Sequence, residues 1–279
     1  MRRVWLFNFD ADNELAKPLG YQASAAVLAR ASELSAKVGG LLQPDDVLLG
    51  DGDTRGARGM AWCPTPRAFH LFAEAGVELP DAPSLDVLQR VNHRRFCAEL
   101  GQTLHGARFL TMRSELDDTL SSATTDWLLK RPFSFSGRGR RRAICGRIDR
   151  DLERWVDASL RRDGLQVEPL VNRTADFALH GFVTTESWLL GSPCGQVVAE
   201  DGSWVATTPD AKLASHERHA LIAGGELVGE ALQAAGYFGP FGIDAYRYDD
   251  QFNPRSEINA RYTMGWAVGM HERPDLVSR

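Results

Sequence analysis

The chain has 279 residues, of which 43% are hydrophobic, so it can build one large domain or two to three small domains with ordinary cores. Its formal net charge of −5 argues against bulk attraction to nucleic acid or to an anionic membrane. No apolar run reaches the roughly 18 residues of a membrane span. The four cysteines are scattered without a metal-binding or disulfide pattern, which indicates free thiols in a reducing cytoplasm.

The N-terminal third alternates between strand-like and helix-like segments. Its first apolar run is interrupted at Asn8 and Asp10, which is typical of a strand and not of a signal peptide. The alternation predicts a parallel sheet with helices outside it. In chain order, we expect a strand over 4–9, a helix over 24–38, a strand over 46–49, a helix over 65–75 opened by Pro66, and bridging helices over 84–100 capped by Ser84 or Asp86.

Acidic and amide side chains follow the first strand, at Asp10, Asp12, Asn13 and Glu14. Ligands of open α/β sheets usually bind at the carboxyl ends of the strands. Asp and Asn also begin turns and cap helices, and capping is the favoured explanation here. In a functional role, these side chains suit a substrate amine better than a metal. The same two explanations, a turn or capping role and a functional role, apply to Asp51 and Asp53 after the second strand.

A lysine and a glycine-rich loop follow the apolar strand WLL. The strand delivers Lys130 to a loop whose backbone N–H groups can approach an anion closely, because glycine carries no side chain. The order differs from the GxxxxGK[ST] phosphate loop, and GxGxxG is absent, so a dinucleotide site is not supported. The alternative is a basic surface turn. The candidate residues are Ser134, Ser136, Gly137 and Gly139, with the basic run 138–142 as a phosphate clamp.

The segment LQVEPLVNRTADF places Glu168 at the end of a β-rich run and Asp176 on the next strand. Glu168 could accept a hydrogen bond from the amino group of adenine, and Asp176 could accept one from a ribose hydroxyl. The alternative is a plain hairpin with a solvated Glu. Charged or amphipathic helices are expected over 149–162 and over 217–235, the second ended by Gly236.

Residues 239–265 are expected to form a β-hairpin that carries a metal site. With the turn centred between Asp250 and Gln251, Asp244 lies opposite Glu257, and Asn259 shares the face of Glu257. Two carboxylates and an amide oxygen are hard ligands, too few to enclose a metal alone. They suit Mg²⁺ that also holds the phosphates of a nucleotide. The alternative is a hairpin with polar residues on its solvated face.

The order of these motifs resembles that of the ATP-grasp superfamily, and the spacing of Asp244, Glu257 and Asn259 is similar to that of D-alanine–D-alanine ligase and its relatives. The stretches LFNFDADNELA, KRPFSFSGRGRR, VEPLVNRTADFA and EINARYTMG resemble uncharacterised bacterial ATP-grasp proteins. The resemblance implies an α/β fold with a small parallel N-terminal pre-ATP-grasp domain over 1–90. A two-lobed α+β ATP-grasp domain with antiparallel sheets would follow over 91–279, with a central or lid lobe over 91–165 and a C-terminal lobe over 166–279.

The resemblance also implies ATP as the cofactor, with two Mg²⁺ ions, or Mn²⁺, on Asp244, Glu257 and Asn259. Lys130 would contact the α-phosphate and the adenine side, and the loop from Ser136 to Gly139 would cover the β- and γ-phosphates. Adenine would be read by Glu168 and the backbone of Leu170, and ribose by Asp176. Many ATP-grasp ligases carry a lysine where this chain has His93-Arg94-Arg95, so we expect Arg94 at a phosphate, with a different geometry.

The expected activity is that of an ATP-dependent ligase, in which a carboxylate forms an acyl phosphate and an amine, or a thiol, then displaces phosphate. Arg261 would bind the substrate carboxylate or the phosphoryl oxygens, unless it forms a salt bridge instead. Lys212 and Arg138 are further catalytic candidates. The alternatives are a small-molecule kinase and a non-catalytic nucleotide-binding module. The expected partners are a small carboxylic acid and an amine, with neither nucleic acid nor membrane, and a homodimer is left open.

Overall fold

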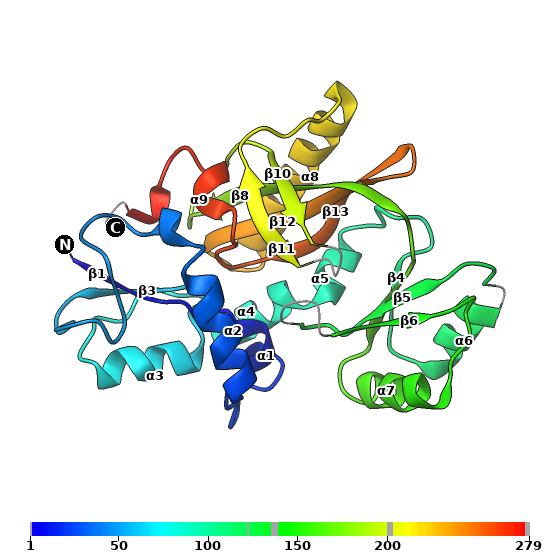
Figure 1. Ribbon diagram of the computed structural model, residues 1–279, viewed down its shortest axis with the longest axis horizontal. Helices are drawn as coiled ribbons and strands as arrows, with labels where there is room; N and C mark the ends of the chain where they lie inside the picture. Colours follow the sequence, from blue (N-terminus) through cyan, green and yellow to red (C-terminus); the bar gives the residue numbers. More distant parts are fainter. Residues whose placement is uncertain (1, 122, 135–138, 200–202, 277–279) are drawn as a thin grey trace.

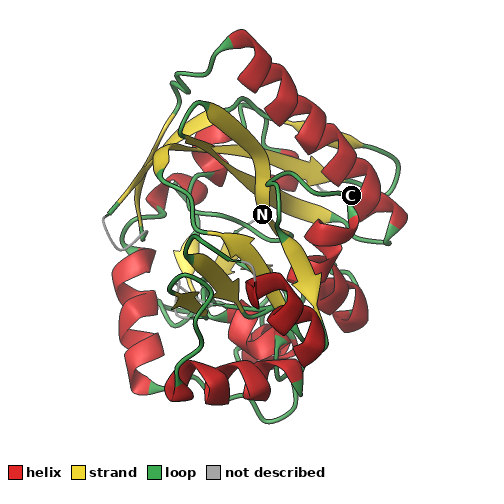
Figure 2. Ribbon diagram, turned by 90° about the vertical axis from the view of Figure 1, so that its right-hand side faces the viewer, coloured by secondary structure: helices red, strands yellow, loops and turns green. Residues whose placement is uncertain are grey.

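The computed structural model describes residues 2–121, 123–134, 139–199 and 203–276, which form three β-sheets with helices packed around them (Figure 1). One sheet is parallel and two are antiparallel, so the predicted fold class is confirmed. Figure 2 shows the longest helix, α8, along the outer side of the largest sheet. No helix in these ranges is long and apolar enough to cross a membrane.

The N-terminal unit is a three-stranded parallel sheet of order β2-β1-β3. Thr65 caps α3 by accepting a hydrogen bond from the backbone N–H of Ala68, and Pro66 occupies the first turn, as predicted. Strand β3 and helix α1 were not predicted: β3 has the sequence RGMA, which contains no β-branched or aromatic residue, and α1 has only five residues. The elements are β1 (Arg3–Leu6), α1 (Ala11–Leu15), α2 (Ala25–Ser35), η1 (Gly39–Leu41), β2 (Val47–Leu48), β3 (Arg58–Ala61) and α3 (Pro66–Glu74).

Two helices, α4 (Leu85–Asn92) and α5 (Arg94–Glu99), connect this unit to the rest of the chain. Ser84 caps α4, as one of the two predicted alternatives. His93 ends α4 and caps α5, since its Nδ1 accepts a hydrogen bond from the backbone N–H of Arg95 at 3.1 Å. The turn at His93 places Arg94 at the start of α5. The predicted domain boundary at residue 90 falls inside α4 and stays a prediction.

The second unit, here called the lid lobe, is a four-stranded antiparallel sheet of order β4-β7-β5-β6 with α6 and α7 on one face (Figure 1). Leu129 and Val167 point to the helices and are fully buried in their own core cluster. Because side chains alternate along a strand, Lys130 and Glu168 point to the opposite face. The elements are β4 (Arg108–Leu110), α6 (Arg113–Ser121), β5 (Trp127–Lys130), β6 (Arg140–Ala143), α7 (Arg150–Leu160) and β7 (Leu165–Pro169).

The third unit is a six-stranded antiparallel sheet of order β11-β10-β8-β12-β13, with β9 paired to β8. Helix α8 packs closely on one face because it carries glycines there. A Cβ on Gly225 would lie 2.6 Å from Leu179, and one on Gly229 would lie 2.6 Å from Trp188. The elements are β8 (Arg173–Val183), β9 (Trp188–Leu190), β10 (Cys194–Val198), β11 (Trp204–Thr208), α8 (Ser215–Ala234), β12 (Gly239–Tyr248), β13 (Gln251–Asn259), α9 (Trp266–Gly269) and η2 (Pro274–Leu276).

The β12–β13 hairpin pairs Asp244 with Glu257, as predicted, although by a different route. The turn lies one residue earlier than expected, at Asp249 and Asp250, with Asp249 in a left-handed conformation at φ +45°. A bulge between Tyr246↔Asn253 and Asp244↔Glu257 then inserts extra residues on β13. The bulge contains Pro254, which cannot donate to the ladder. The two differences compensate, and the predicted register at the site is restored.

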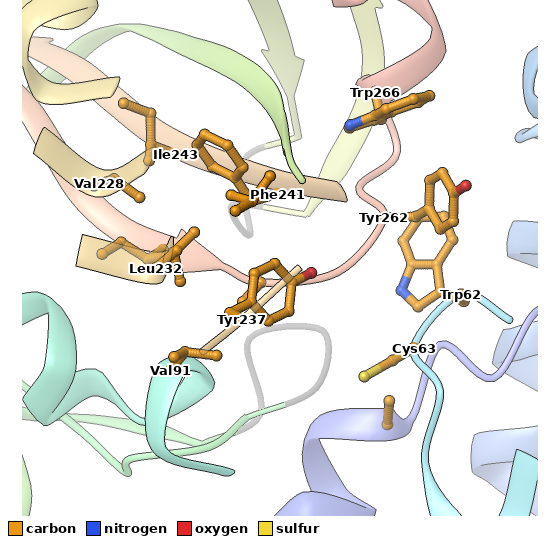
Figure 3. Packing of buried hydrophobic residues seen from close by; sticks show 14 of the residues in the cluster. Trp62, Cys63, Val91, Val228, Leu232, Tyr237, Phe241, Ile243, Tyr262 and Trp266 are labelled. Atoms are coloured by element: carbon orange, nitrogen blue, oxygen red, sulfur yellow. The ribbon is translucent and has the colours of Figure 1, made fainter. Parts of the chain in front are cut away.

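One continuous core joins the N-terminal unit to the large sheet. The ring of Tyr262 lies 5.1 Å from the rings of Trp5 and Trp266, and 6.5 Å from the ring of Trp62. Figure 3 shows Tyr262 and Trp62 on the far side of the core from α8. The lid lobe has a separate core cluster. We infer that the N-terminal unit and the large sheet behave as one body, and that the lid lobe is a second body with its own core.

We expect a buried histidine on β8 to make the fold sensitive to acid. His180 is 1% exposed, its Nδ1 lies 3.0 Å from the hydroxyl of Thr263, and burial lowers its pKa from 6.5 to about 4. Below pH 6.5 the unfolded chain binds a proton there while the folded chain stays neutral. The free energy of unfolding should therefore fall between pH 6.5 and 4 by about 3 kcal/mol from this group. Denaturant titrations check this: the loss should be smaller by that amount in His180→Gln, and an equal loss in both proteins would contradict it.

Candidate active site

The predicted metal ligands lie together on the face of the large sheet opposite α8. Ile243 and Ala245 point into the core beneath α8, so the side chain of Asp244 between them points away from it. Asn259 Nδ2 donates to Asp244 Oδ2 at 3.2 Å. Gln196 Nε2 on β10 donates to Asp244 Oδ1, also at 3.2 Å. The structure thus brings Asp244, Glu257 and Asn259 to one place.

The charges at this place suit a bound cation. Burial and the neighbouring charge of Glu257 raise the pKa of Asp244 from 3.8 to about 6. Burial also acts against ionisation of Glu257, but Arg94 and Lys130 lower the pKa of that carboxyl. In the described part of the chain, no three His, Cys, Asp or Glu side chains form a group that could hold a metal. Two carboxylates and one amide fit Mg²⁺ or Mn²⁺ whose remaining ligands are phosphate and water oxygens.

Arg94 connects the metal ligands to the start of the glycine-rich loop. Its NH2 donates to Glu257 Oε1 at 2.9 Å and to the hydroxyl of Ser134 at 3.2 Å, and its Nε donates to the carbonyl of Arg131 at 3.0 Å. Arg94 is 8% exposed, and its NH1 has no hydrogen-bond partner within the described ranges. A buried guanidinium N–H without a partner is costly unless an anion accepts from it. This observation supports the expected phosphate contact of Arg94.

Lys130 and Glu168 form a buried ion pair on the lid lobe, with 2.5 Å between Nζ and Oε1. Gln166 donates to the other carboxylate oxygen of Glu168 at 3.3 Å. Burial lowers the pKa of Lys130, and the charge of Glu168 opposes this effect. The backbone N–H of Leu170 already donates to the carbonyl of Asp126 at 2.8 Å. Only the carbonyl of Leu170 is therefore left to form a hydrogen bond with adenine. Of the two predicted adenine contacts, Glu168 therefore lies beside Lys130, whereas Leu170 follows the end of β7 and lies beside Asp126.

Asp176 lies on β8, at the opening between the lid lobe and the large sheet. Burial raises the pKa of its carboxyl, although Arg173 opposes the shift with an NH1–Oδ1 distance of 3.4 Å. A cavity of about 650 Å³ is lined there by residues of both units, including Leu128, Leu170 and Asp176. Its volume lies within the range of small-molecule sites. The predicted ribose contact thus faces a space large enough for part of a nucleotide.

The glycine-rich loop is described only at its two ends. Ser134 accepts from Arg94, and the carbonyl of Gly139 accepts from the backbone N–H of Arg131 at 2.8 Å. A Cβ on Gly139 would lie 2.5 Å from the Cβ of Ser134, so this position requires glycine for the close approach of the two ends. The predicted loop residues Ser136, Gly137 and Arg138 lie outside the described residues.

Arg261 is committed to an internal ion pair, which is the alternative to its expected substrate contact. Its NH2 donates to Asp12 Oδ2 at 2.7 Å and to Asn259 Oδ1 at 2.9 Å, and its Nε lies 3.3 Å from Asp12 Oδ1. Its NH1 donates to the carbonyl of Tyr262 at 3.2 Å. With every nitrogen engaged, Arg261 positions the ligand Asn259 and does not offer a free fork to a substrate carboxylate.

The acidic residues after β1 also differ from the expectation. Asp10 occupies the cap position of α1 but makes no side-chain cap hydrogen bond. It pairs instead with Arg67 at 2.6 Å, while Glu14 accepts from the hydroxyl of Thr65, also at 2.6 Å. Asp10, Asp12 and Glu14 are all buried and already have internal partners, so in this structure none of these carboxylates is free for a substrate amine. Asp53 is exposed and pairs with Arg55.

Lys212 is not brought to this site. It is exposed, and its carbonyl accepts from Arg247, whose guanidinium lies over the ring of Phe177 on the α8 face of the sheet. Two contributors were missed by the sequence reasoning. The position of Gln196 in the site depends on the pairing of β10 with β8, and no local sequence motif predicts that pairing. Asp12 was noticed as a residue, but its partner Arg261 lies 249 positions away.

Comparisons with known proteins agree in fold. No family model matches the sequence, and no curated protein matches it. Among solved structures, N5-carboxyaminoimidazole synthetase from Staphylococcus aureus, solved with ADP, has a TM-score of 0.54 at 10% identity, covering 97% of this chain and 78% of that one. D-alanyl-alanine synthetase A from Vibrio cholerae has 0.55 at 11% identity, covering 92% and 87%. Biotin carboxylase from Campylobacter jejuni has 0.58 at 11% identity, covering 98% and 72%.

Proposed function

This chain has the ATP-grasp fold, and we propose that it is an ATP-dependent ligase that joins a small carboxylic acid to an amine or a thiol. The observation that carries the proposal is the placement of Arg94. It touches Glu257 of the metal-ligand group on one side and Ser134 of the glycine-rich loop on the other, and it keeps a buried N–H without a partner. Two of the similar structures are synthetases, and one was solved with ADP, which supports the same direction.

Each group of residues in the site has its own proposed binding role. Glu168, Leu170 and Asp176 would hold the nucleoside, and Lys130, Arg94 and the loop from Ser134 to Gly139 would hold the phosphates. Asp244, Glu257 and Asn259 would hold Mg²⁺, which offsets the phosphate charge when bound. The protein contributes positioning and electrostatic stabilisation, and the phosphoryl group moves from ATP to the substrate carboxylate without a covalent enzyme intermediate. ADP and phosphate leave, and a new C–N or C–S bond remains.

A small-molecule kinase on the same fold is the second candidate. One specific observation favours it: the carboxylates expected to hold an amine, Asp10, Asp12 and Glu14, all have internal partners. A non-catalytic nucleotide-binding module is less well supported. Burial and the charge of Glu257 raise the pKa of Asp244, and a bound metal ion would offset this cost, whereas pure nucleotide binding needs no such pair of carboxylates.

The ligase proposal predicts that ADP release requires two co-substrates. Purified protein with Mg–ATP should be incubated with acids and amines singly and in pairs, and ADP should be measured by a coupled assay. We expect release only with a matching pair, and a product whose mass equals acid plus amine minus water. A stable phosphorylated product formed from one co-substrate would establish the kinase instead. The absence of any ADP release across the panel, together with measurable ATP binding, would favour the binding module.

A further inference from the structure

A second cavity, of about 310 Å³, lies between the N-terminal unit and the lid lobe. It is lined by Lys17, which follows α1, by Arg131, which follows β5, and by Ser159 and Arg162 near the end of α7. It shares no lining residue with the cavity beside Asp176. Its volume fits a small organic acid or a phosphate group.

Arg131 is held in place before any ligand arrives. Its Nε donates to the hydroxyl of Ser159 at 2.9 Å, and its guanidinium stacks 4.9 Å above the ring of Trp155. Ser159 is itself buried and fixed, because it donates to the carbonyl of Trp155 at 2.7 Å. A planar fork held in one orientation loses little entropy when an anion binds to it.

Positive charge predominates around this cavity. None of Lys17, Arg131 and Arg162 has a carboxylate within salt-bridge distance among the described residues, and Asp163 is the single acidic residue in the lining. Burial and the charges of Arg162 and Arg141 lower the pKa of Arg131. By contrast, Arg67 and Arg261 each have a carboxylate partner within 2.7 Å. Lys17 and Arg162 are exposed and Arg131 is half-buried, so all three charges can meet an anion that enters the cavity.

The cavity adjoins the groups proposed to hold the phosphates. The backbone N–H of Arg131 donates to Gly139 at 2.8 Å, and its carbonyl accepts from Arg94, which contacts Glu257. A neighbouring cavity of about 690 Å³ shares Phe133 and Arg162 in its lining, so a larger molecule has room to continue. The backbone of Arg131 therefore links this cavity to the groups proposed to hold the phosphates, while the neighbouring cavity continues toward His93 and Arg95.

We propose that this cavity binds an anionic group, a phosphate or a carboxylate, on the substrate that is not ATP. This assignment of the ligand as a substrate rests on the proposed function, whereas the anion site itself does not. The substrate class is a small molecule with two anionic groups, one that reacts and one that anchors between Lys17, Arg131 and Arg162. Because Lys17 belongs to the N-terminal unit and the two arginines to the lid lobe, the anchored anion bridges the two units.

The test is the binding of inorganic phosphate to the full chain, with saturating Mg–ADP to occupy the nucleotide site. Isothermal calorimetry or ³¹P line broadening gives the Kd. We expect Arg162→Gln and Lys17→Gln each to raise the Kd about tenfold, which is typical of one lost charge-assisted hydrogen bond. Arg161→Gln is the matched control, because it removes the same charge from the adjacent exposed residue, which lines neither cavity. Arg131→Lys keeps the charge but loses the fork and should also weaken binding.

Three results would overturn the anion site. The wild-type protein could fail to bind phosphate at millimolar concentration. The Arg161→Gln control could weaken binding as much as Arg162→Gln, which would mean a general charge effect. Arg162→Gln could lower the affinity for ATP and leave that for ADP unchanged, which would assign the cavity to the γ-phosphate. Phosphate binding as expected, combined with no ligation or phosphorylation of any co-substrate, would instead contradict the proposed function and leave the anion site standing.

Discussion

Replacing Glu257 with glutamine should abolish Mg²⁺-dependent turnover of ATP, with a loss of about 10²–10³-fold or more, the range seen when a group that stabilises transition-state charge is removed. The carboxylate is the one proposed metal ligand bonded directly to Arg94, so the change removes a ligand and a counter-charge together. The fold should survive, since the Glu257 side chain is 33% exposed and glutamine can still accept from Arg94. ADP production and thermal melting of the same protein sample measure both effects.

A matched control lies on the other face of the same sheet. Glu217 is buried and accepts two hydrogen bonds from Arg247, at 2.7 and 2.6 Å, on the α8 side. Glu217→Gln should lower the free energy of unfolding by about 1.5–3 kcal/mol, because hydrogen bonds to a charged group are weakened, and should leave turnover unchanged. Wild-type turnover in Glu257→Gln, or an equal loss of turnover in both variants, would remove the metal assignment.

Replacing Lys130 with methionine should destabilise the lid lobe by about 3–5 kcal/mol, because Glu168 would be left as a buried charge without its partner. The two side chains are 7% and 5% exposed. The double variant Lys130→Met with Glu168→Gln should recover much of this stability, because no net charge then remains buried. ATP affinity should be lost in the single and in the double variant, since both residues are proposed to contact the nucleotide. Denaturant titration and calorimetry with ATP measure the two quantities.

An exposed cluster in the same lobe provides the comparison. Arg113 pairs with Asp117 at 2.8 Å, with Asp157 at 3.1 Å and with Glu153 at 3.6 Å, and its own side chain is 37% exposed. Arg113→Met should change stability by less than about 1 kcal/mol, because solvent screens exposed pairs, and should leave ATP binding intact. Recovery of ATP binding in the Lys130/Glu168 double variant would show that this ion pair serves stability alone.

The parts of the fold that follow from local pattern were predictable from the sequence. Thr65 and Pro66 begin α3, and Ser84 begins α4, because capping depends only on nearby residues. The pairing of Asp244 with Glu257 was also predicted, although the turn was misplaced by one residue and the bulge at Pro254 was not foreseen. A register prediction depends on counting from the turn, so the correct pairing here rests on two compensating differences.

The contacts that assemble the site were less predictable, because they join distant segments. The role of Arg261 depends on Asp12, and nothing in the sequence near either residue indicates that they meet. The position of Gln196 beside Asp244 requires the strand order β10-β8-β12, which alternating hydrophobicity cannot supply. The side on which Lys212 lies follows from Arg247 packing against Phe177, which is again a tertiary contact.

The ion pair between Asp12 and Arg261 has a consequence for how the chain folds. The two residues are 249 positions apart, and closing a loop of that length costs on the order of 5 kcal/mol of chain entropy. This cost is met before the ion pair stabilises the fold. During synthesis, Trp5 and Trp62 emerge long before Tyr262, the ring that covers them. The lid lobe, whose core draws on residues 110–167, can fold in the meantime. The N-terminal aromatic surface stays uncovered until residue 262 has left the ribosome, so this interval is when nascent chains are most exposed to aggregation and to chaperones.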